Sequence, residues 1–184
     1  MTTTIDIDQL AEALADDLET AFPELVRRLA DDVFSGCLRM LGNRADAEEV
    51  AQEAFLRAYR ALRDYDGGRI RALRVRGWVW TIAANLCRNR LRSRARHPET
   101  ELSVDPPDTT SGPEATAITS AERAELATRL GRLPWPVRSA VVLRHVVGLS
   151  YDEIAEALER PVGTVKSDVH RGLERLRREG KDAS

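Results

Sequence analysis

The stretch from Leu149 to Arg178, LSYDEIAEALERPVGTVKSDVHRGLERLRR, decides how the C-terminal part of this chain folds. Ser150 and Glu153 stand three residues apart, a spacing that lets the hydroxyl cap a helix while the carboxylate bonds back to the cap residue. Pro161 interrupts the helical pattern and predicts a reversal of the chain. Because a second helical pattern follows the proline, the stretch predicts a helix-turn-helix.

The second helix of this motif has two chemically different faces. Apolar side chains recur at helical spacing on the face expected to pack inward, namely Val165, Val169, Leu173 and Leu176. The outward positions carry side chains that can bond to phosphates and base edges, namely Thr164, Lys166, Ser167, His170, Arg171 and Arg175. Two short amphipathic helices and a turn also occur in proteins that touch no DNA, so this motif alone leaves both interpretations open.

The composition indicates a helical protein. The chain has 184 residues, of which 42% are hydrophobic and 32% charged, with only three each of Trp, Tyr and Phe. We therefore expect an all-α fold with an aliphatic core. No apolar run approaches the ~20 residues that span a bilayer, and the acidic N-terminus lacks the features of a signal peptide. The sequence predicts a cytoplasmic protein without membrane insertion.

The cysteines and histidines argue against a metal site and against catalysis. Cys37 and Cys87 lie in apolar helical patterns without a CxxC partner, so they are predicted to be buried thiols. His97, His145 and His170 show no ligand spacing such as HExxH. We therefore expect no metal, no cofactor, no catalytic residue and no enzymatic activity.

Charge is strongly segregated along the chain, although the formal net charge is only −2. Residues 67–98 contain nine arginines and no Asp or Glu, whereas the residues before Val33 contain nine acids and two arginines. A basic block of this kind is the electrostatic footprint of a nucleic-acid-binding surface. The near-neutral total therefore does not exclude DNA.

Apolar periodicity predicts helices along most of the chain. A helix is expected within residues 1–20, and others over 22–41 with Gly42 as its stop, over 46–65 with Asp46 opening a capping box, and over 77–96, 121–131 and 137–147. Residues 64–76 are interpreted as a flexible basic loop or a short helix. Prolines among Ser, Thr, Asp and Glu make residues 98–120 a linker between two domains.

Two helix faces are candidate interfaces. On the helix over 46–65, Glu49, Gln52, Glu53 and Leu56 form an acidic row that ends in a leucine. This row is either a solvated face or a strip that docks on a basic protein. On the helix over 77–96, Trp78 precedes a polar side with Asn85, Arg88, Asn89, Arg92 and Arg96, a mixture suited to phosphates and unpaired bases. The two tryptophans of this segment are, however, more often core residues than base-stacking platforms.

Three segments in this order resemble a known family. DAEEVAQEAFLRAYRAL (46–62), GWVWTIAANLCRNRLR (77–92) and LPWPVRSAVVLRHVVGLSYDEIAEALERPVGTVKSDVHRGLERLR (133–177) are similar to the group IV, extracytoplasmic-function (ECF) bacterial RNA polymerase sigma factors of the sigma-70 family. The resemblance implies an acidic N-terminal extension over 1–21, a sigma-2-like domain over 22–97, the linker over 98–120, and a sigma-4-like helix-turn-helix domain over 121–184. It also implies promoter-specific transcription initiation on core RNA polymerase.

The resemblance assigns candidate residues to each task. The row on the first segment would meet the β′ clamp helices of the polymerase, with Asp46, Glu49, Gln52, Glu53 and Leu56. Recognition and melting of the −10 element would fall to Arg74, Arg76, Trp78, Asn85, Arg88, Asn89 and Arg92. The −35 major groove would receive Thr164, Lys166, Ser167, His170, Arg171 and Arg175. The β flap is a second polymerase contact, and an anti-sigma factor, which restrains many relatives, is a candidate partner.

Two residues depart from the family pattern. Asn89 stands where many members have Asp, and Asp168 stands where Arg or Lys is usual. Asp168 is expected beside the groove, where it would repel phosphate or accept a hydrogen bond from cytosine N4.

Two other functions would explain only part of this sequence pattern. A helix-turn-helix regulator that acts without polymerase would share the C-terminal domain but not the acidic row or the arginine block. A nuclease that uses Glu48, Glu49 and Glu53 with a metal lacks a converging second set of ligands.

Overall fold

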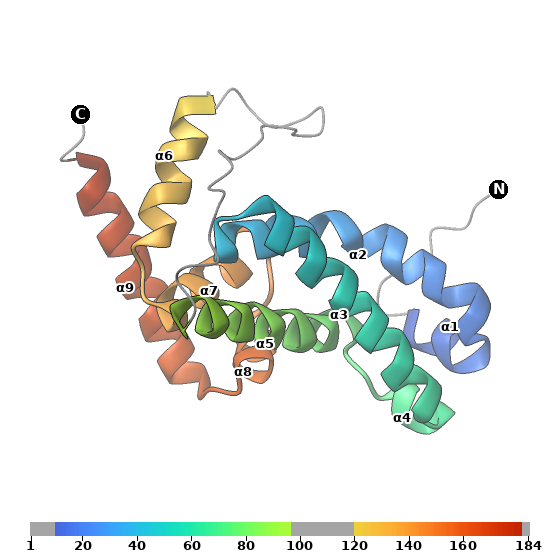
Figure 1. Cartoon of the computed structure of the whole chain (residues 1–184). Coiled ribbons are helices and arrows are strands. Elements are labelled where there is room, and N and C mark those ends of the chain that lie inside the picture. Colours follow the sequence, from blue (N-terminus) through green and yellow to red (C-terminus); the bar gives the residue numbers. More distant parts are fainter. Residues whose placement is uncertain (1–9, 97–119, 182–184) are drawn as a thin grey trace.

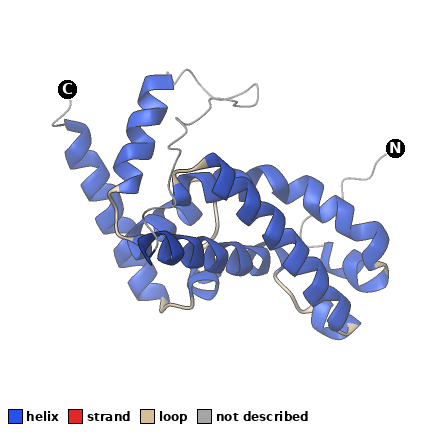
Figure 2. Ribbon diagram, in the orientation of Figure 1, coloured by secondary structure: helices blue, strands red, loops and turns tan. Residues whose placement is uncertain are grey.

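The computed structural model describes residues 10–96 and 120–181, and within them the chain is helices joined by short loops (Figures 1 and 2). The predicted all-α fold is confirmed for these residues. The first nine residues of the expected acidic extension, and all of the expected linker except Ser120, lie outside the described residues.

Residues 10–96 form five helices, which make up the described N-terminal part. Their bounds are α1 Leu10–Asp16, α2 Leu18–Leu41, α3 Arg44–Asp64, α4 Gly67–Arg71 and α5 Val75–Arg96. The long helices α2, α3 and α5 pack on one another, and the short helices α1 and α4 lie together at one end of the bundle (Figure 1). The expected basic loop over 64–76 thus contains one short helix, which begins where the Asp66 side chain accepts a hydrogen bond from the Arg69 amide at 2.9 Å.

In the C-terminal part the structure describes residues 120–181, which form four helices. Their bounds are α6 Ser120–Gly131, α7 Trp135–His145, α8 Tyr151–Leu158 and α9 Val162–Lys181. Helices α8 and α9 form the predicted helix-turn-helix, and α7 packs beneath both of them.

Several helices begin a few residues before the expected positions, with α2 starting at Leu18, α5 at Val75 and α7 at Trp135. Their ends follow local chemistry. Gly42 has a positive φ of 69° and ends α2, as predicted. Helix α3 begins two residues earlier than Asp46, because the side chain of Asn43 accepts from the Asp46 amide at 2.9 Å and acts as the N-cap. The prediction of Asp46 as the capping residue was wrong, since its carboxylate pairs with arginines of α5.

Helices α3 and α5 approach closely because α3 carries alanines on its inner face. Ala47, Ala54 and Ala58 are fully buried there. On α5 the buried face carries Val79, Trp80, Ala83, Ala84 and Cys87, whereas Trp78, Ile82, Leu86 and Leu91 are only half-buried.

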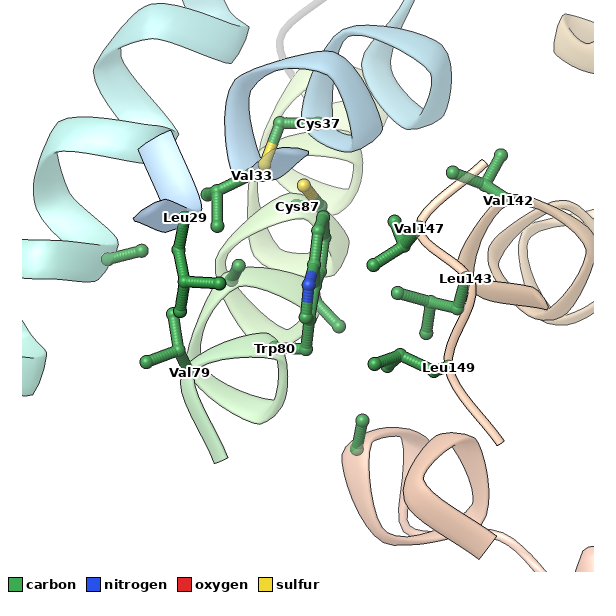
Figure 3. Close-up of a cluster of buried hydrophobic side chains, with 14 of the residues drawn as sticks. Leu29, Val33, Cys37, Val79, Trp80, Cys87, Val142, Leu143, Val147 and Leu149 are labelled. Atoms are coloured by element: carbon green, nitrogen blue, oxygen red, sulfur yellow. The ribbon is translucent and has the colours of Figure 1, made fainter. Parts of the chain in front are cut away.

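The two parts of the chain share a core around Trp80. This side chain is fully buried, and Leu143, Val147 and Leu149 from the C-terminal part face it in Figure 3. On its other side Gly36 leaves room for the ring, since a Cβ at this glycine would lie 2.3 Å from the ring carbon Cη2 of Trp80. The C-terminal part therefore packs directly on helix α5, with α8 as the main contact.

Candidate nucleic-acid and protein interfaces

Helix α9 has the two faces predicted for it. Val165 and Val169 are buried, while Lys166, Ser167, His170, Arg171 and Arg175 are exposed and Thr164 is half-buried. Gly172 lets the helix lie close to α7, because a Cβ there would come within 2.4 Å of Cγ2 of Val141. The structure therefore brings all six predicted −35 residues to one helix, and five of them are exposed.

The turn before α9 is built from specific backbone interactions. The capping box of α8 is present: the Ser150 hydroxyl accepts from the Glu153 amide at 3.2 Å, and the Glu153 carboxylate accepts from the Ser150 amide at 2.7 Å. Glu159 ends α8 with a φ of 53°, in the left-handed region. This reversal fixes the angle at which α9 leaves the turn.

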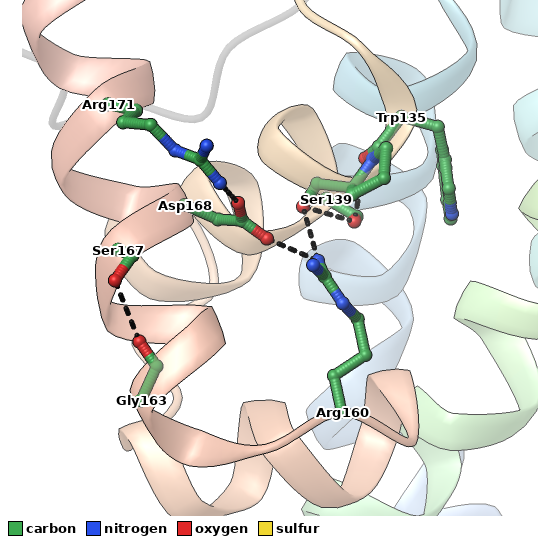
Figure 4. Close-up of polar contacts among 8 residues, drawn as sticks. Trp135, Ser139, Arg160, Gly163, Ser167, Asp168 and Arg171 are labelled. Atoms are coloured by element: carbon green, nitrogen blue, oxygen red, sulfur yellow. Dashed lines mark hydrogen bonds and ion pairs between the residues drawn. The ribbon is translucent and has the colours of Figure 1, made fainter.

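Asp168 does not face a DNA groove, and the expectation that it would was wrong. Its side chain is only 1% exposed, and its two carboxylate oxygens accept hydrogen bonds from Arg160 and Arg171 (Figure 4). The physical reason is its register, since it lies three residues after Val165 and four before Gly172, on the edge of the inward face. A buried carboxylate needs such partners, because an unpaired buried charge is very costly.

Sequence reasoning missed an aromatic residue beside the predicted −35 face. Tyr151, the first residue of α8, lies between two cations: the Arg144 guanidinium is 4.9 Å and the Lys166 ammonium 5.6 Å from the ring centroid. Cation–π contacts of this kind restrict the lysine side chain. The signal available in the sequence was an aromatic residue directly after the cap Ser150.

The predicted −10 residues all lie on or next to α5. Arg74, Asn89 and Arg92 are exposed, whereas Arg76, Trp78, Asn85 and Arg88 are half-buried. The Trp78 ring lies 6.1 Å from that of Tyr65, and the Arg69 guanidinium is 3.6 Å from the Tyr65 centroid. Tyr65 and Arg69 extend the predicted site, and a tyrosine and an arginine flanking the Gly-Gly pair were the signal for them.

Two of these arginines contact the C-terminal part. Arg76 donates to the backbone carbonyl of Val147 and lies 3.7 Å from the Asp32 carboxylate. Arg74 lies 3.5 Å from the carboxylate of Glu156 on α8. Both guanidinium groups are therefore engaged in this arrangement of the chain.

A cleft of about 300 Å³ separates α5 from α7 and α8. Its walls include Asn85, Arg88 and Arg92 from α5 and Trp135 and Arg160 from the C-terminal part. Arg88 donates to Oδ1 of Asn85 at 2.6 Å, but its buried Nε has no acceptor within the described residues. Glu159 also lines the cleft and Arg160 pairs with Asp168, so Arg88 and Arg92 are the lining arginines without an ion-pair partner within the described residues.

The acidic row on α3 is exposed along most of its length. Gln52 is exposed, Leu56 is 43% exposed, and Glu49 is exposed beside Arg90, with which it pairs. Glu53 accepts from Arg57 at 2.6 Å. Leu56 is one of three exposed large hydrophobic residues in the described parts of the chain.

Asp46 differs from the rest of the row. Its side chain is 16% exposed and pairs with both Arg90 and Arg94 of α5. Asp46 therefore ties α3 to α5 and offers less to a partner than the other four residues.

The two cysteines face each other in the core (Figure 3). Both are buried and free, as predicted. Contact with the Cys37 thiol and burial raise the pKa of Cys87 well above its ordinary value. Since the thiolate is the reactive form, Cys87 is chemically inert at neutral pH.

Comparison with known proteins places this geometry in a class. Residues 25–97 match the family model for sigma-70 region 2, and residues 123–176 match the model for sigma-70 region 4. A helical bundle followed by a helix-turn-helix, each with its own match, defines the sigma-70 class of transcription factors.

The relatives are more specific. The chain is 34% identical to the ECF RNA polymerase sigma factor SigW of Bacillus subtilis, over 89% of this chain and 91% of the relative. The chain is also 38% identical to the ECF RNA polymerase sigma factor SigE of Mycolicibacterium smegmatis, and this match covers 85% of this chain and 60% of the longer relative. The chain belongs to the ECF sigma factors.

Solved structures agree on the fold. CnrH in complex with the cytosolic domain of CnrY is 26% identical, has a TM-score of 0.72, and is matched over 97% of this chain and all of that one. The sigma factor RpoE in complex with the anti-sigma factor NepR from Bartonella quintana is 19% identical, has a TM-score of 0.69, and is matched over 87% of this chain and 96% of that one. Among the helices in residues 10–96 and 120–181, none is long and apolar enough to cross a membrane.

Proposed function

We propose that this sigma factor binds core RNA polymerase through the exposed row on α3 and directs it to promoters by two DNA contacts. Helix α9 enters the −35 major groove with its exposed polar face, and α5 with the α4 loop binds the opened −10 strand. The observation that carries the −35 assignment is the pattern on α9, where five polar or basic side chains are exposed directly opposite a buried valine stripe.

The −10 assignment rests on uncompensated positive charge. Arg88, Asn89 and Arg92 follow one another along α5, and neither arginine has an ion-pair partner within the described residues. The buried Nε of Arg88 also has no acceptor there. Strand phosphates supply such acceptors, and the Tyr65, Arg69 and Trp78 cluster supplies stacking surfaces for unpaired bases.

The proposed function requires the two parts of the chain to separate. The −35 and −10 elements centre about 25 base pairs apart, which is about 85 Å at 3.4 Å per base pair. In the present arrangement α8, the neighbour of α9 in the motif, packs directly on α5. One closed molecule cannot reach both elements, so polymerase binding is proposed to stabilise an open form.

The remaining parts of the proposal concern organisation and partners. The domains are 22–97 and 121–184, preceded by the extension 1–21 and joined by 98–120, although α2 already begins at Leu18. The protein acts in the cytoplasm, performs no chemistry itself, and has the β′ clamp helices, the β flap and promoter DNA as partners. An anti-sigma factor is a further proposed partner, supported by the complex in which the similar fold of RpoE was solved.

Run-off transcription with a promoter library tests the function. Purified protein with core polymerase is expected to start transcription at specific promoters, whereas the protein alone is expected to bind duplex DNA poorly. If no library member is transcribed, the proposed function is wrong. Initiation also discriminates against a regulator that acts without polymerase.

Paired variants test the division of labour. Gln52→Ala with Glu53→Ala should weaken polymerase binding and leave −35 DNA binding unchanged, while Arg171→Ala should do the reverse, at a cost of ~1–3 kcal/mol for a bidentate base contact. Glu48→Ala is the matched control, since it removes an exposed acid of α3 outside the row. Unchanged polymerase affinity in the double variant would remove the docking assignment.

A further inference from the structure

We propose that Asp168 is a positioning residue that holds Arg171 ready to read the −35 element, an inference that rests on the proposed function. The first observation is its burial. Asp168 is one of two buried polar or charged residues in the described parts of the chain, with a side chain only 1% exposed, although it lies in the middle of the recognition helix. It cannot reach a base edge itself.

The second observation is how the carboxylate is used. Oδ2 accepts a hydrogen bond from Nη1 of Arg160, and Oδ1 accepts one from Nη2 of Arg171, so each oxygen serves a different arginine (Figure 4). Arg160 is largely buried, at 27% exposed, and also lies 3.5 Å from the Pro136 carbonyl at the start of α7. The carboxylate is thereby fixed from the inner side.

The third observation is the exposure of Arg171. Its side chain is 65% exposed although one of its donors is held by Asp168. A guanidinium has five N–H donors, and Asp168 occupies one, so the others remain free for a base edge and its phosphate. Asp168 therefore holds the guanidinium in place and leaves N–H donors that can bond to O6 and N7 of a guanine.

Fixing a long side chain before binding removes an entropy cost at the moment of binding. Ordering one flexible side chain at an interface weakens binding by about 2- to 12-fold. By holding Arg171 in one rotamer before DNA binds, Asp168 removes this entropic cost for that rotamer and disfavours the other rotamers. The charge balance adds to the effect, since Asp168 neutralises one of two neighbouring arginines and lowers attraction to DNA of any sequence. The residue thus raises the preference for the correct −35 sequence.

The experiment uses holoenzyme formed from the full chain and core polymerase. A promoter recovered in the library experiment is prepared with its −35 element randomised, and the bound fraction is sequenced. Arg171→Ala should abolish the preference at one or two adjacent base pairs. Asp168→Asn should relax the preference at those same base pairs by about 2- to 12-fold and increase binding to unrelated duplex DNA.

Controls separate positioning from folding and from charge. Asp152→Asn removes one exposed acid from the first turn of α8 and should leave every base preference unchanged. Adding Asp168→Asn to Arg171→Ala should produce no further relaxation, because the residue to be positioned is gone. If Asp168→Asn does not fold by circular dichroism, Asp168→Glu, which keeps the charge but moves the oxygens by one methylene, should relax the same base pairs.

Two outcomes overturn the inference. One is an unchanged preference in a folded Asp168 variant, and the other is an equal loss at all positions, which indicates a general structural role. Both leave the proposed function intact, because the wild-type chain must already have recovered the promoter. Failure at that earlier step would remove the −35 assignment and this inference together.

Discussion

A covalent lock between α5 and α8 is predicted to abolish promoter-dependent transcription. The variant is Gly77→Cys with Glu153→Cys. A Cβ built on Gly77 lies 3.6 Å from the Cβ of Glu153, and its next neighbours are at 3.5 and 3.9 Å, so a cysteine fits without a clash. Disulfides have Cβ···Cβ distances of about 3.5–4.5 Å, and the distance between these two positions lies within that range.

The size of the effect follows from the geometry and the loop length. The disulfide bond holds α5 and α8 at contact distance. Binding both promoter elements requires the domains that contain α5 and α9 to move apart to a distance on the order of 85 Å. A loop closed between residues 77 and 153 should stabilise the oxidised protein against unfolding by up to about 4.5 kcal/mol. At about 2–4 °C per kcal/mol, the unfolding midpoint should rise by up to about 9–18 °C.

The assay compares oxidised and reduced protein in run-off transcription with core polymerase. The oxidised variant should give no promoter-specific transcript, and a thiol reductant should restore it in the same tube. Each single cysteine variant is a control for the loss of Gly77 or of the α8 capping box. Cys37 and Cys87 are buried and face each other (Figure 3), so mass spectrometry of the oxidised protein must place the new disulfide between residues 77 and 153.

One result would refute the reasoning. If the oxidised variant, with its disulfide verified by mass spectrometry, initiates as well as the reduced one, the two parts need not separate. The closed arrangement would then be compatible with promoter recognition.

Two further predictions concern stability. Gly172→Ala should lower the unfolding midpoint, because its Cβ would lie 2.4 Å from Val141 and overpacking costs about 1–3 kcal/mol. Gly163→Ala on the same helix meets open space and is the neutral control. Equal melting curves for the two variants would contradict the close approach of α9 to α7. Glu24→Gln should destabilise the protein at neutral pH, because hydrogen bonds from Arg27 and Arg28 lower the pKa of Glu24 from 4.5 to about 2. The stabilisation from these hydrogen bonds is complete above pH 4.5 and is lost as the pH falls toward 2. The free energies of unfolding of wild type and variant, measured with denaturant, should therefore become equal near pH 2. A difference that persists at pH 2 would rule out the ion pair as its source.

Local signals in the sequence predicted the helix-turn-helix well. The Ser150 and Glu153 pair, Pro161 and the valine stripe of α9 each act over one helical turn, so they can be seen without knowing the rest of the fold. Gly42 was equally clear, since a residue in the left-handed region at a helix end favours glycine.

Asp168 was misplaced because its position depends on partners outside the helix. On helical spacing alone it lies at the border between inward and outward positions, and a charged residue there is normally assigned to solvent. Burial of the carboxylate is compensated by Arg171 on the same helix and by Arg160, which approaches from the turn. The sequence does not show that approach.

Asp46 was misjudged for a similar reason. Capping by Asp46 was plausible locally, but Asn43 takes that role and Asp46 pairs with two arginines of a helix about 45 residues away in the chain. Trp80 was not singled out, because its surroundings include Leu143 and Leu149 from the other part of the chain. Contacts between distant segments are what periodicity cannot reveal.

The shared core around Trp80 limits how freely the two domains can be exchanged between sigma factors. A chimera that joins the N-terminal domain of this chain to a helix-turn-helix domain from a relative must fill the space opposite the indole that Leu143, Val147 and Leu149 fill here. A smaller set leaves a cavity, and a larger set forces the domains apart before polymerase is present. The two domains must therefore match each other at the few apolar positions around Trp80. A chimera without that match should differ from the parent in the stability of the closed form, and so in the conditions under which it is active, as well as in the DNA that it binds.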